Sequence, residues 1–137
     1  MLQPKKTKHR KWQKGRSLNR GIITKGFRLV HGILGLKSLE SRILTDKQIE
    51  AAWNEIRRTL GNKGRVWLRI FPHKPITKKP PEVRMGGGKG DVVGYGTLVR
   101  PGTILFEVDG SDKNLLLESL NRASYKLPIK VKIVSEE

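Results

Sequence analysis

The sequence predicts an α+β fold, in which a single compact domain packs two helices on a mixed or antiparallel sheet. Two stretches repeat apolar residues at helical spacing, and several others alternate apolar with polar residues as strands do. A length of 137 residues suits one hydrophobic core rather than two. We divide the chain into a basic N-terminal arm, residues 1–20, and a core, residues 21–137, that carries a projecting loop at 72–90.

The first half of the core combines glycine-containing strands with one helix. Apolar residues separated by glycines between residues 21 and 39 favour short strands with turns or bulges. Thr45, with Gln48 three residues later, has the pattern of a capping box, so we expect a helix to start here. Gly61 ends that helix, and its apolar face contains Ile49, Ala52, Trp53, Ile56 and Leu60.

Strands are predicted on both sides of the projecting loop. Residues 65–71 alternate as a strand does and lead into the loop, and residues 92–99 resume strand character after it. The dipeptide Pro101-Gly102 is typical of a turn. We therefore expect residues 103–108 to be the hairpin partner of residues 92–99.

A second helix and a final strand complete the predicted core. Ser111 or Asp112 is suited to cap the helix, and Pro128 stops it. Residues 129–134 alternate as a last strand. The side chains that the second helix is expected to bury are Leu116, Leu120, Ala123 and Leu127.

Net charge and cysteine content restrict the classes of function. The formal net charge is +17, so the chain is expected to bind a polyanion, with nucleic acid as the leading class. The absence of cysteine excludes disulfides, cysteine zinc sites and thiol nucleophiles, and it fits a reducing compartment. No apolar run has the length of a membrane span or the place of a secretory signal, so we expect the mature protein to begin at or near Met1.

The N-terminal arm carries cations with no acidic residue to balance them. The first acidic residue of the chain is Glu40, and the arm lacks apolar periodicity, so we expect nucleic-acid phosphates to order it. Trp12 has two interpretations, which are stacking on a base or sugar and pinning of the arm to the core. The predicted RNA-binding side chains of the arm are Lys5, Lys6, Lys8, Arg10, Lys11, Lys14, Arg16 and Arg20.

The stretch from Pro72 to Gly90 is too long and too rich in proline and glycine to be a simple connector. Its prolines fix φ and remove donors while its glycines free φ, so we expect neither a helix nor a strand ladder to run through it. Glu82 is its single acidic residue. A probe for RNA phosphates and a solvated, charged flap both fit this composition. The cations of the stretch are Lys74, Lys78, Lys79, Arg84 and Lys89.

No catalytic or metal site can be assembled from the sequence. The glycine-rich run 86–90 lacks the spacing of a nucleotide-binding P-loop, because Lys89 is followed by a glycine and then by a strand. Asp109 and Asp112 are explained by a turn and a helix cap, since Lys113 stands where a calcium loop needs a ligand oxygen. The histidines have no partner at metal-ligand spacing. We therefore expect no enzymatic activity and no cofactor.

Distinctive blocks of sequence occur in order along nearly the whole chain. They begin with residues 1–11 and 14–16 and include Gly64-Arg-Val-Trp-Leu-Arg-Ile-Phe-Pro72. The other blocks are residues 35–37, 48–52, 74–77, 83–86, 88–90, 101–102, 109–110 and 126–130. Together these blocks resemble the large-subunit ribosomal protein L-sixteen family, of the bacterial and organellar type.

The resemblance implies a structural protein of the large ribosomal subunit, in the bacterial cytoplasm or, for an organelle-encoded chain, in the mitochondrial matrix or plastid stroma. The implied partners are large-subunit rRNA, tRNA and neighbouring ribosomal proteins, with no membrane and no small-molecule substrate. The family's long loop points toward tRNA in the A site near the peptidyl-transferase region, and Arg84 occupies its arginine position. The loop residues with this implied role are Lys74, Lys78, Lys79, Arg84, Met85, Gly86, Gly88, Lys89 and Gly90.

Two other classes of function remain open from the residues alone. A free nucleic-acid-binding protein, such as a nucleoid factor or an RNA chaperone, is the main alternative, although neither predicted helix is basic enough to read a groove. A basic enzyme acting on RNA would need an acid-base or metal set. Trp53 also has two interpretations, core or RNA-facing, because its neighbours Ile49, Ala52 and Ile56 already make a continuous apolar face.

Overall fold

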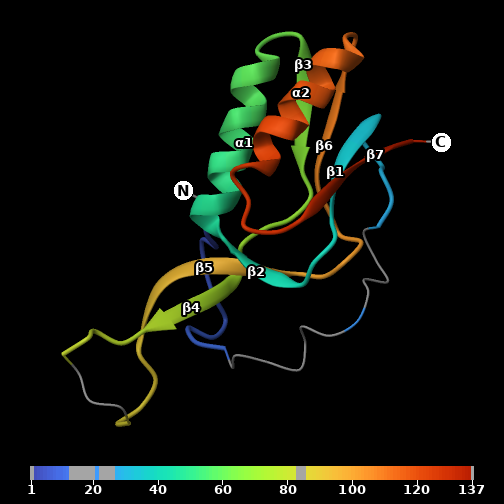
Figure 1. The fold of residues 1–137 in the computed structure, drawn as a ribbon. Coiled ribbons are helices and arrows are strands. Elements are labelled where there is room, and N and C mark those ends of the chain that lie inside the picture. Colours follow the sequence, from blue (N-terminus) through green and yellow to red (C-terminus); the bar gives the residue numbers. More distant parts are fainter. Residues whose placement is uncertain (1, 13–20, 22–26, 83–85, 137) are drawn as a thin grey trace.

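The computed structural model describes residues 2–12, 21, 27–82 and 86–136. Within these ranges it confirms the α+β fold, with two helices and seven strands arranged in two antiparallel sheets (Figure 1). The elements in chain order are β1 (Leu34–Ser38), β2 (Arg42–Thr45), α1 (Asp46–Leu60), β3 (Gly64–Leu68), β4 (Lys74–Lys78), β5 (Asp91–Val99), β6 (Ile104–Gly110), α2 (Lys113–Ser124) and β7 (Val131–Ser135). The four-stranded sheet has the order β3-β6-β1-β7, and the three-stranded sheet has the order β2-β5-β4.

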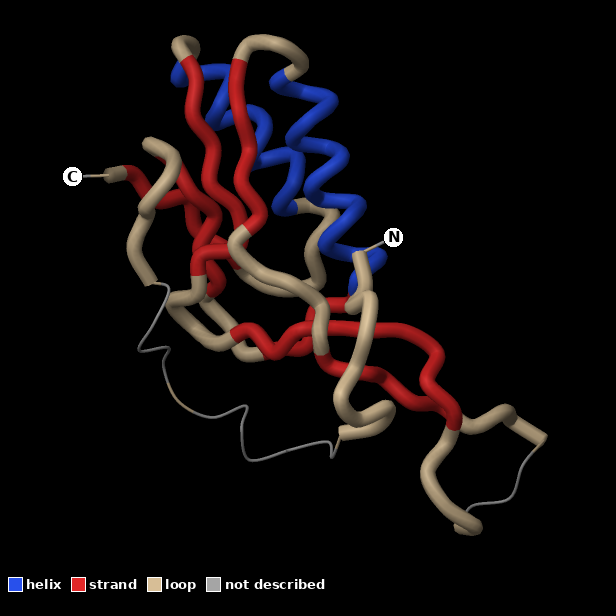
Figure 2. Tube along the Cα trace, turned by 180° about the vertical axis from the view of Figure 1, so that it is seen from behind, coloured by secondary structure: helices blue, strands red, loops and turns tan. Residues whose placement is uncertain are grey.

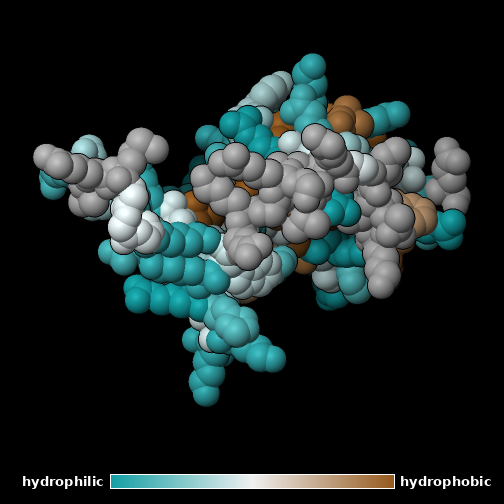
Figure 3. All heavy atoms as spheres, turned by 90° about the horizontal axis from the view of Figure 1, so that it is seen from below, coloured by the Kyte–Doolittle hydropathy of each residue, from teal (hydrophilic) through white to brown (hydrophobic). Residues whose placement is uncertain are grey.

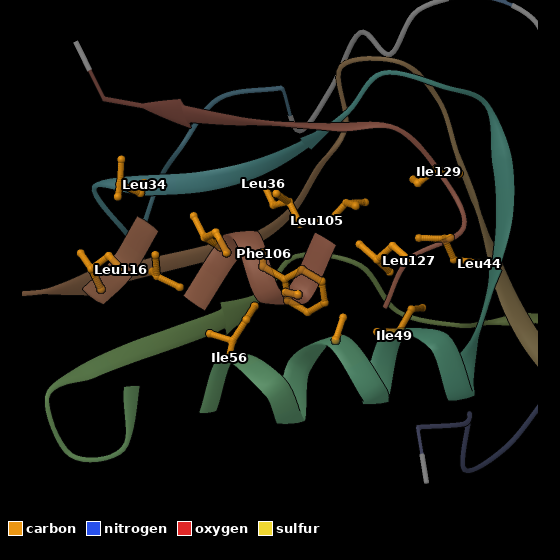
Figure 4. Packing of buried hydrophobic residues seen from close by; sticks show 14 of the residues in the cluster. Leu34, Leu36, Leu44, Ile49, Ile56, Leu105, Phe106, Leu116, Leu127 and Ile129 are labelled. Carbon is orange, nitrogen blue, oxygen red and sulfur yellow. The ribbon is translucent and has the colours of Figure 1, made fainter. Parts of the chain in front are cut away.

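The hydrophobic core lies between the two helices and the four-stranded sheet. Both helices run side by side on one face of this sheet (Figure 1). Figure 4 shows side chains from the sheet and from both helices meeting in one cluster, with Phe106 of β6 among them. Phe106 is completely buried, as are Leu36 of β1 and Ile56 of α1. Burial of each such side chain stabilises the fold by about 1.5–3 kcal/mol, so this cluster is the main source of stability.

Both helices begin as the sequence predicts. The Thr45 side chain accepts a hydrogen bond from the backbone N–H of Gln48, and the Gln48 side chain accepts one from the backbone N–H of Thr45, which confirms the capping box. Asp112 caps α2 by accepting from two backbone N–H groups of its first turn. That helix ends at Ser124, a few residues before Pro128. Neither helix in the described part of the chain is long and apolar enough to cross a membrane.

The predicted hairpin between residues 92–99 and 103–108 is wrong. These segments form β5 and β6, which belong to different sheets. The backbone of the intervening turn instead bonds to the end of β1, where Gly102 N–H donates to the Ser38 carbonyl and Ser38 N–H donates to the Thr103 carbonyl, both at 2.8 Å. A turn dipeptide fixes only the local reversal of the chain, and here the chain changes sheets as it reverses.

Three other strand boundaries differ from the predictions. The strand predicted over 65–71 ends at Leu68, and the last strand begins at Val131. Of the described residues between 27 and 39, only Leu34–Ser38 forms a strand, and residues 22–26 lie outside the described part. Strand β2, residues 42–45, was not predicted, because its few residues directly precede the capping box and have no alternation of their own.

The prediction that no strand ladder runs through residues 72–90 is also wrong. Residues 74–78 form β4, which pairs antiparallel with β5 from Lys74 opposite Gly96 to Lys78 opposite Asp91. Proline is tolerated here because β4 is an edge strand, so the missing N–H of Pro75 removes no bond from a second neighbour. The irregular connection therefore shortens to residues 79–90.

Strand β5 is shared between the body of the protein and the hairpin that it forms with β4, which we call the projecting hairpin. The half of β5 near Val99 pairs with β2, and the half near Asp91 pairs with β4 alone, so the hairpin extends away from the helices (Figure 1). The halves meet at Gly96, where an added Cβ would lie 2.8 Å from the Leu44 carbonyl oxygen and 2.9 Å from Ile76 Cδ1. Glycine lets the neighbouring strands pack closely at this root of the hairpin.

A buried carboxylate joins three segments on the four-stranded sheet. Glu107 lies in β6 and its side chain has no solvent exposure. It accepts hydrogen bonds from the backbone N–H groups of Val30, His31 and Gly32 at 3.0, 2.5 and 2.9 Å, and it forms an ion pair with Arg69. Burial raises the pKa of Glu107, but these hydrogen bonds outweigh it and leave the pKa below its ordinary value. The segment before β1 and the chain after β3 are thus fastened to β6.

We expect Glu107→Gln to reduce the free energy of unfolding at neutral pH by about 1–3 kcal/mol, because charge-assisted bonds to a buried acceptor are lost. The lowered pKa gives the direction of the pH dependence. Stability from ionised Glu107 is fully present above the pKa of the unfolded chain and is lost as pH falls through the lower folded-state pKa. Urea unfolding from neutral into acid pH should therefore show a flatter profile for the variant.

The matched control is Glu118→Gln, because Glu118 pairs with Arg122 at 2.7 Å on the surface of α2. Exposed pairs contribute about 0–1 kcal/mol, so this variant should follow the parent protein. Parallel pH profiles for Glu107→Gln and the parent protein would contradict the assignment.

Candidate nucleic-acid interface

The described part of the N-terminal arm presents its predicted cations to solvent. Leu2 packs against the core cluster, and the basic side chains that follow it are exposed up to Arg10. Lys11 is half-buried, whereas Lys14, Arg16 and Arg20 lie outside the described residues. The exposed cations of the arm are Lys5, Lys6, Lys8 and Arg10.

The end of the described arm contacts the projecting hairpin. The Trp12 and His73 rings meet edge to face with their centroids 5.3 Å apart. Lys11 Nζ donates to the Lys89 carbonyl at 3.2 Å, and Lys89 Nζ donates to the Trp12 carbonyl. Figure 2 shows this segment of the arm passing β4 and β5. We call these four residues the arm–hairpin junction, and its contacts favour the interpretation that Trp12 pins the arm.

The junction concentrates positive charge from segments far apart in the sequence. Both lysines donate to backbone carbonyls, and neither forms an ion pair with a carboxylate in the described part of the chain. Trp12 remains 41% exposed. Two ammonium groups beside an exposed indole are a suitable setting for a phosphate and a sugar or base.

The projecting hairpin carries cations along its length and bare backbone at its end. Lys78 is exposed, Lys74 is half-buried, and Lys79 Nζ donates to the Gly86 carbonyl. Gly86 and Gly88 are exposed with φ of 98° and 107°, so their backbone is open to close approach by another molecule. In Figure 3, teal and near-white residues, which are hydrophilic or near the middle of the scale, make up most of the described surface on the left, where the hairpin lies.

Other predicted hairpin residues have different settings. Gly90 is half-buried, and an added Cβ would lie 2.7 Å from the backbone carbonyl carbon of Lys78. Arg84 and Met85 lie outside the described residues. The structure thus joins the arm to the hairpin through the junction, and the roles of individual side chains in binding stay predictions.

A groove between α1 and the edge strand β3 was not predicted from the sequence. It has a volume of about 580 Å³, and its lining includes Trp53, Arg57 and Arg65. The spacing of apolar residues predicted the apolar face of α1 and left Trp53 as either core or RNA-facing, and Trp53 lies half-buried on the edge of that face. Arginines at the C-terminal end of a helix, followed closely by another in an edge strand, are the signal that could have identified the groove.

No group of side chains suited to catalysis emerges from the described residues. No three His, Asp or Glu side chains in this part of the chain are grouped so that they could hold a metal ion. Glu107, whose pKa is lowered, accepts hydrogen bonds from three backbone N–H groups that hold the fold together. What the described surface offers is exposed cations, aromatic rings and open backbone.

Comparison with known proteins relates this arrangement to a family. Residues 4–134 match the family described as ribosomal protein L16p/L10e. The large ribosomal subunit protein uL16 of Christiangramia forsetii is 48% identical over 134 residues, which cover 98% of this chain and 95% of the relative. The large ribosomal subunit protein uL16 of Parabacteroides distasonis is 49% identical over 134 residues, which cover 98% of this chain and 92% of the relative. These matches span the arm, the core and the hairpin together, and the chain therefore belongs to the ribosomal protein L16p/L10e family.

Proposed function

We propose that this protein is a structural component of the large ribosomal subunit that binds rRNA and helps to position tRNA in the A site near the peptidyl-transferase region. In this proposal the N-terminal arm, residues 1–20, and the core surface bind rRNA, while the projecting hairpin reaches tRNA. The observation that carries the proposal is the junction of a cationic arm with a cationic hairpin at Lys11 and Lys89, in a chain of a ribosomal protein family.

The chemistry of the hairpin suits contact with folded RNA. Folded RNA is recognised largely through its shape, its phosphates and its 2′-hydroxyl groups, and a thin hairpin can enter a crevice that a globular surface cannot. The exposed backbone at Gly86 and Gly88 permits close approach to phosphates, and the arginine at position 84 has the geometry to bind a phosphate with two hydrogen bonds. The hairpin therefore combines reach with donors at its end.

The anchoring role of the arm follows from its charge. Lys5, Lys6, Lys8 and Arg10 face solvent, and none of them forms an ion pair with a carboxylate in the described part of the chain, so rRNA phosphates are their suitable partners. Because Trp12 and Lys11 contact the hairpin, rRNA bound to the arm would also hold the hairpin in place. Binding of the arm to rRNA and the position of the hairpin are therefore coupled.

The first expected outcome concerns the salt dependence of binding to large-subunit rRNA. The logarithm of the association constant should fall with the logarithm of salt concentration with a slope of several units, because each neutralised phosphate contributes about 0.7–0.9. Replacing Lys5, Lys6 and Lys8 by glutamine should reduce that slope by about two units, as measured by filter binding over a salt series.

The matched control replaces Lys47, Lys113 and Arg122 by glutamine. It removes the same number of positive charges, but from the two helices instead of the arm. That control should keep the parental slope. An affinity that hardly changes with salt, or equal slopes for the two triple variants, would overturn the role of the arm. Retention on large subunits after a high-salt wash separates the ribosomal protein from a free nucleic-acid-binding protein.

The second expected outcome concerns the hairpin connection. Replacing residues 79–89 by a short glycine linker should leave the free energy of unfolding nearly unchanged, because this segment buries no core side chain in the described structure and loop-closure entropy varies slowly with length. Ribosomes that contain this variant should accommodate A-site tRNA and form peptide bonds more slowly. Arg84→Ala should give a milder defect of about 1–3 kcal/mol in transition-state or binding free energy.

Assembly and tRNA accommodation are measured on the same purified ribosomes. Lys113→Ala, a change at an exposed cation on α2, serves as the control that should behave as the parent does. If ribosomes with the shortened hairpin assemble and accommodate tRNA at the parental rate, the hairpin has no role in positioning tRNA.

A further inference from the structure

We infer that the groove between α1 and β3 is a binding site for one unpaired RNA nucleotide, whose base stacks on the Arg57 guanidinium and whose phosphate is held by Arg57 and Arg65. The inference rests on the proposed function, because it assumes that this protein binds RNA. It adds to that function a specific site on the core, outside both the arm and the projecting hairpin.

The size and lining of the groove suit a nucleotide. Its volume of about 580 Å³ falls within the range of roughly 300–1,000 Å³ found for small-ligand sites. The last two turns of α1 and the chain turn after it form one wall, and the first residues of β3 form the other. The lining side chains of the helix wall include Trp53, Arg57 and Arg58, and those of the strand wall include Arg65 and Trp67.

A stacking surface is already assembled on the helix wall. The Cζ atom of Arg57 lies 5.6 Å from the centroid of the Trp53 ring, so the guanidinium covers one face of the indole. Trp53 is half-buried and its Nε1 atom is buried without a hydrogen-bond partner, whereas Arg57 is exposed. An entering base would therefore stack on the outer face of Arg57, in the way that unpaired RNA bases stack on arginine planes.

The charge on the groove is not neutralised from within the protein. Arg58 lies 3.5 Å from Glu55, but neither Arg57 nor Arg65 forms an ion pair with a carboxylate in the described part of the chain. The C-terminal end of α1 contributes only about half a negative charge, which is less than the charge of these arginines. A phosphate at the groove is therefore attracted to it.

The strand wall supplies polar backbone as well. Strand β3 is an edge of the four-stranded sheet, so its backbone groups that face away from β6 have no partner strand. Such groups are available to hydrogen-bond the edge of a base or a 2′-hydroxyl. A protein strand that extends the sheet is the competing occupant, but the uncompensated arginines favour RNA.

The test uses the full chain and follows the indole N–H signals of Trp12, Trp53 and Trp67 by NMR. The probes are single-stranded hexa-adenylate, a blunt RNA duplex and inorganic phosphate, each at the same moderate salt concentration. Hexa-adenylate should shift the signals of Trp53 and Trp67 with one common affinity, and the duplex should not. Equal shifts from inorganic phosphate would mean that only an anion is bound, which overturns the stacking of a base.

Variants at exposed positions separate stacking from charge without disturbing the core. Arg65→Ala and Arg57→Ala should each weaken hexa-adenylate binding at these signals about tenfold. Arg57→Lys keeps the charge but removes the stacking plane, so it should also weaken hexa-adenylate binding while leaving phosphate binding unchanged. Arg122→Ala, on α2 outside the groove, should bind as the parent does.

The final measurement distinguishes this inference from the proposed function. Large subunits that contain the protein are irradiated with ultraviolet light, and the cross-linked peptide spanning residues 53–67 is identified. A cross-link to rRNA supports the nucleotide site, whereas a cross-link only to another protein overturns it. If that peptide shows no rRNA cross-link while salt-dependent rRNA binding persists, the groove inference fails and the proposed function stands. Loss of both means that the proposed function itself fails.

Discussion

Among the described residues, no side chain of β4 belongs to the hydrophobic core cluster, so the position of the projecting hairpin depends on how β5 is held where it leaves the body. At that root Val99 is completely buried and Thr97 is 6% exposed, whereas Val93, farther along the same strand, is 63% exposed. Strand β2 pairs with the buried half of β5 and runs directly into α1 through the capped Thr45. The hairpin is therefore joined through two consecutive elements to the same helix that packs on the core. A change in the packing of α1 would alter the direction of the hairpin as well as the stability of the fold.

Inside the body, the buried carboxylate of Glu107 is paired with donors of the protein itself, while cations lie on the outside. Glu107 is completely buried, and three backbone N–H groups and Arg69 satisfy its oxygens. The carboxylate has little influence on distant ligands, because the paired guanidinium and the nearby N–H groups offset its negative charge. The formal net charge of the chain is +17. Of the lysines and arginines that the structure describes, none is fully buried. This division lets one small domain keep a stable interior and still present a surface for a polyanion.

Short sequence patterns predicted the helix caps correctly. They did not predict which strands pair with each other. The capping box at Thr45 and the cap at Asp112 depend on residues a few positions apart, so both were predictable. That β5 pairs with β2 and β4 rather than with β6 depends on contacts between distant segments, which no turn dipeptide encodes. Strand β4 was missed because Pro75 breaks a ladder in the middle of a sheet but not at its edge. The cationic arm and hairpin were visible as runs of lysine and arginine, but the groove beside Arg65 needed α1 and β3 to be placed together.

Each edge strand of the two sheets also carries a cation, and this affects the protein before it meets any partner. The outer strands are β3 and β7 in one sheet and β2 and β4 in the other, and they contain Arg65, Lys132, Arg42 and Lys74 respectively. Open strand edges invite pairing with another copy, and like charges on the meeting edges oppose it. Pro75 removes a donor from β4 besides. Cations on all four edge strands therefore oppose the pairing of one copy of the chain with another through a sheet edge.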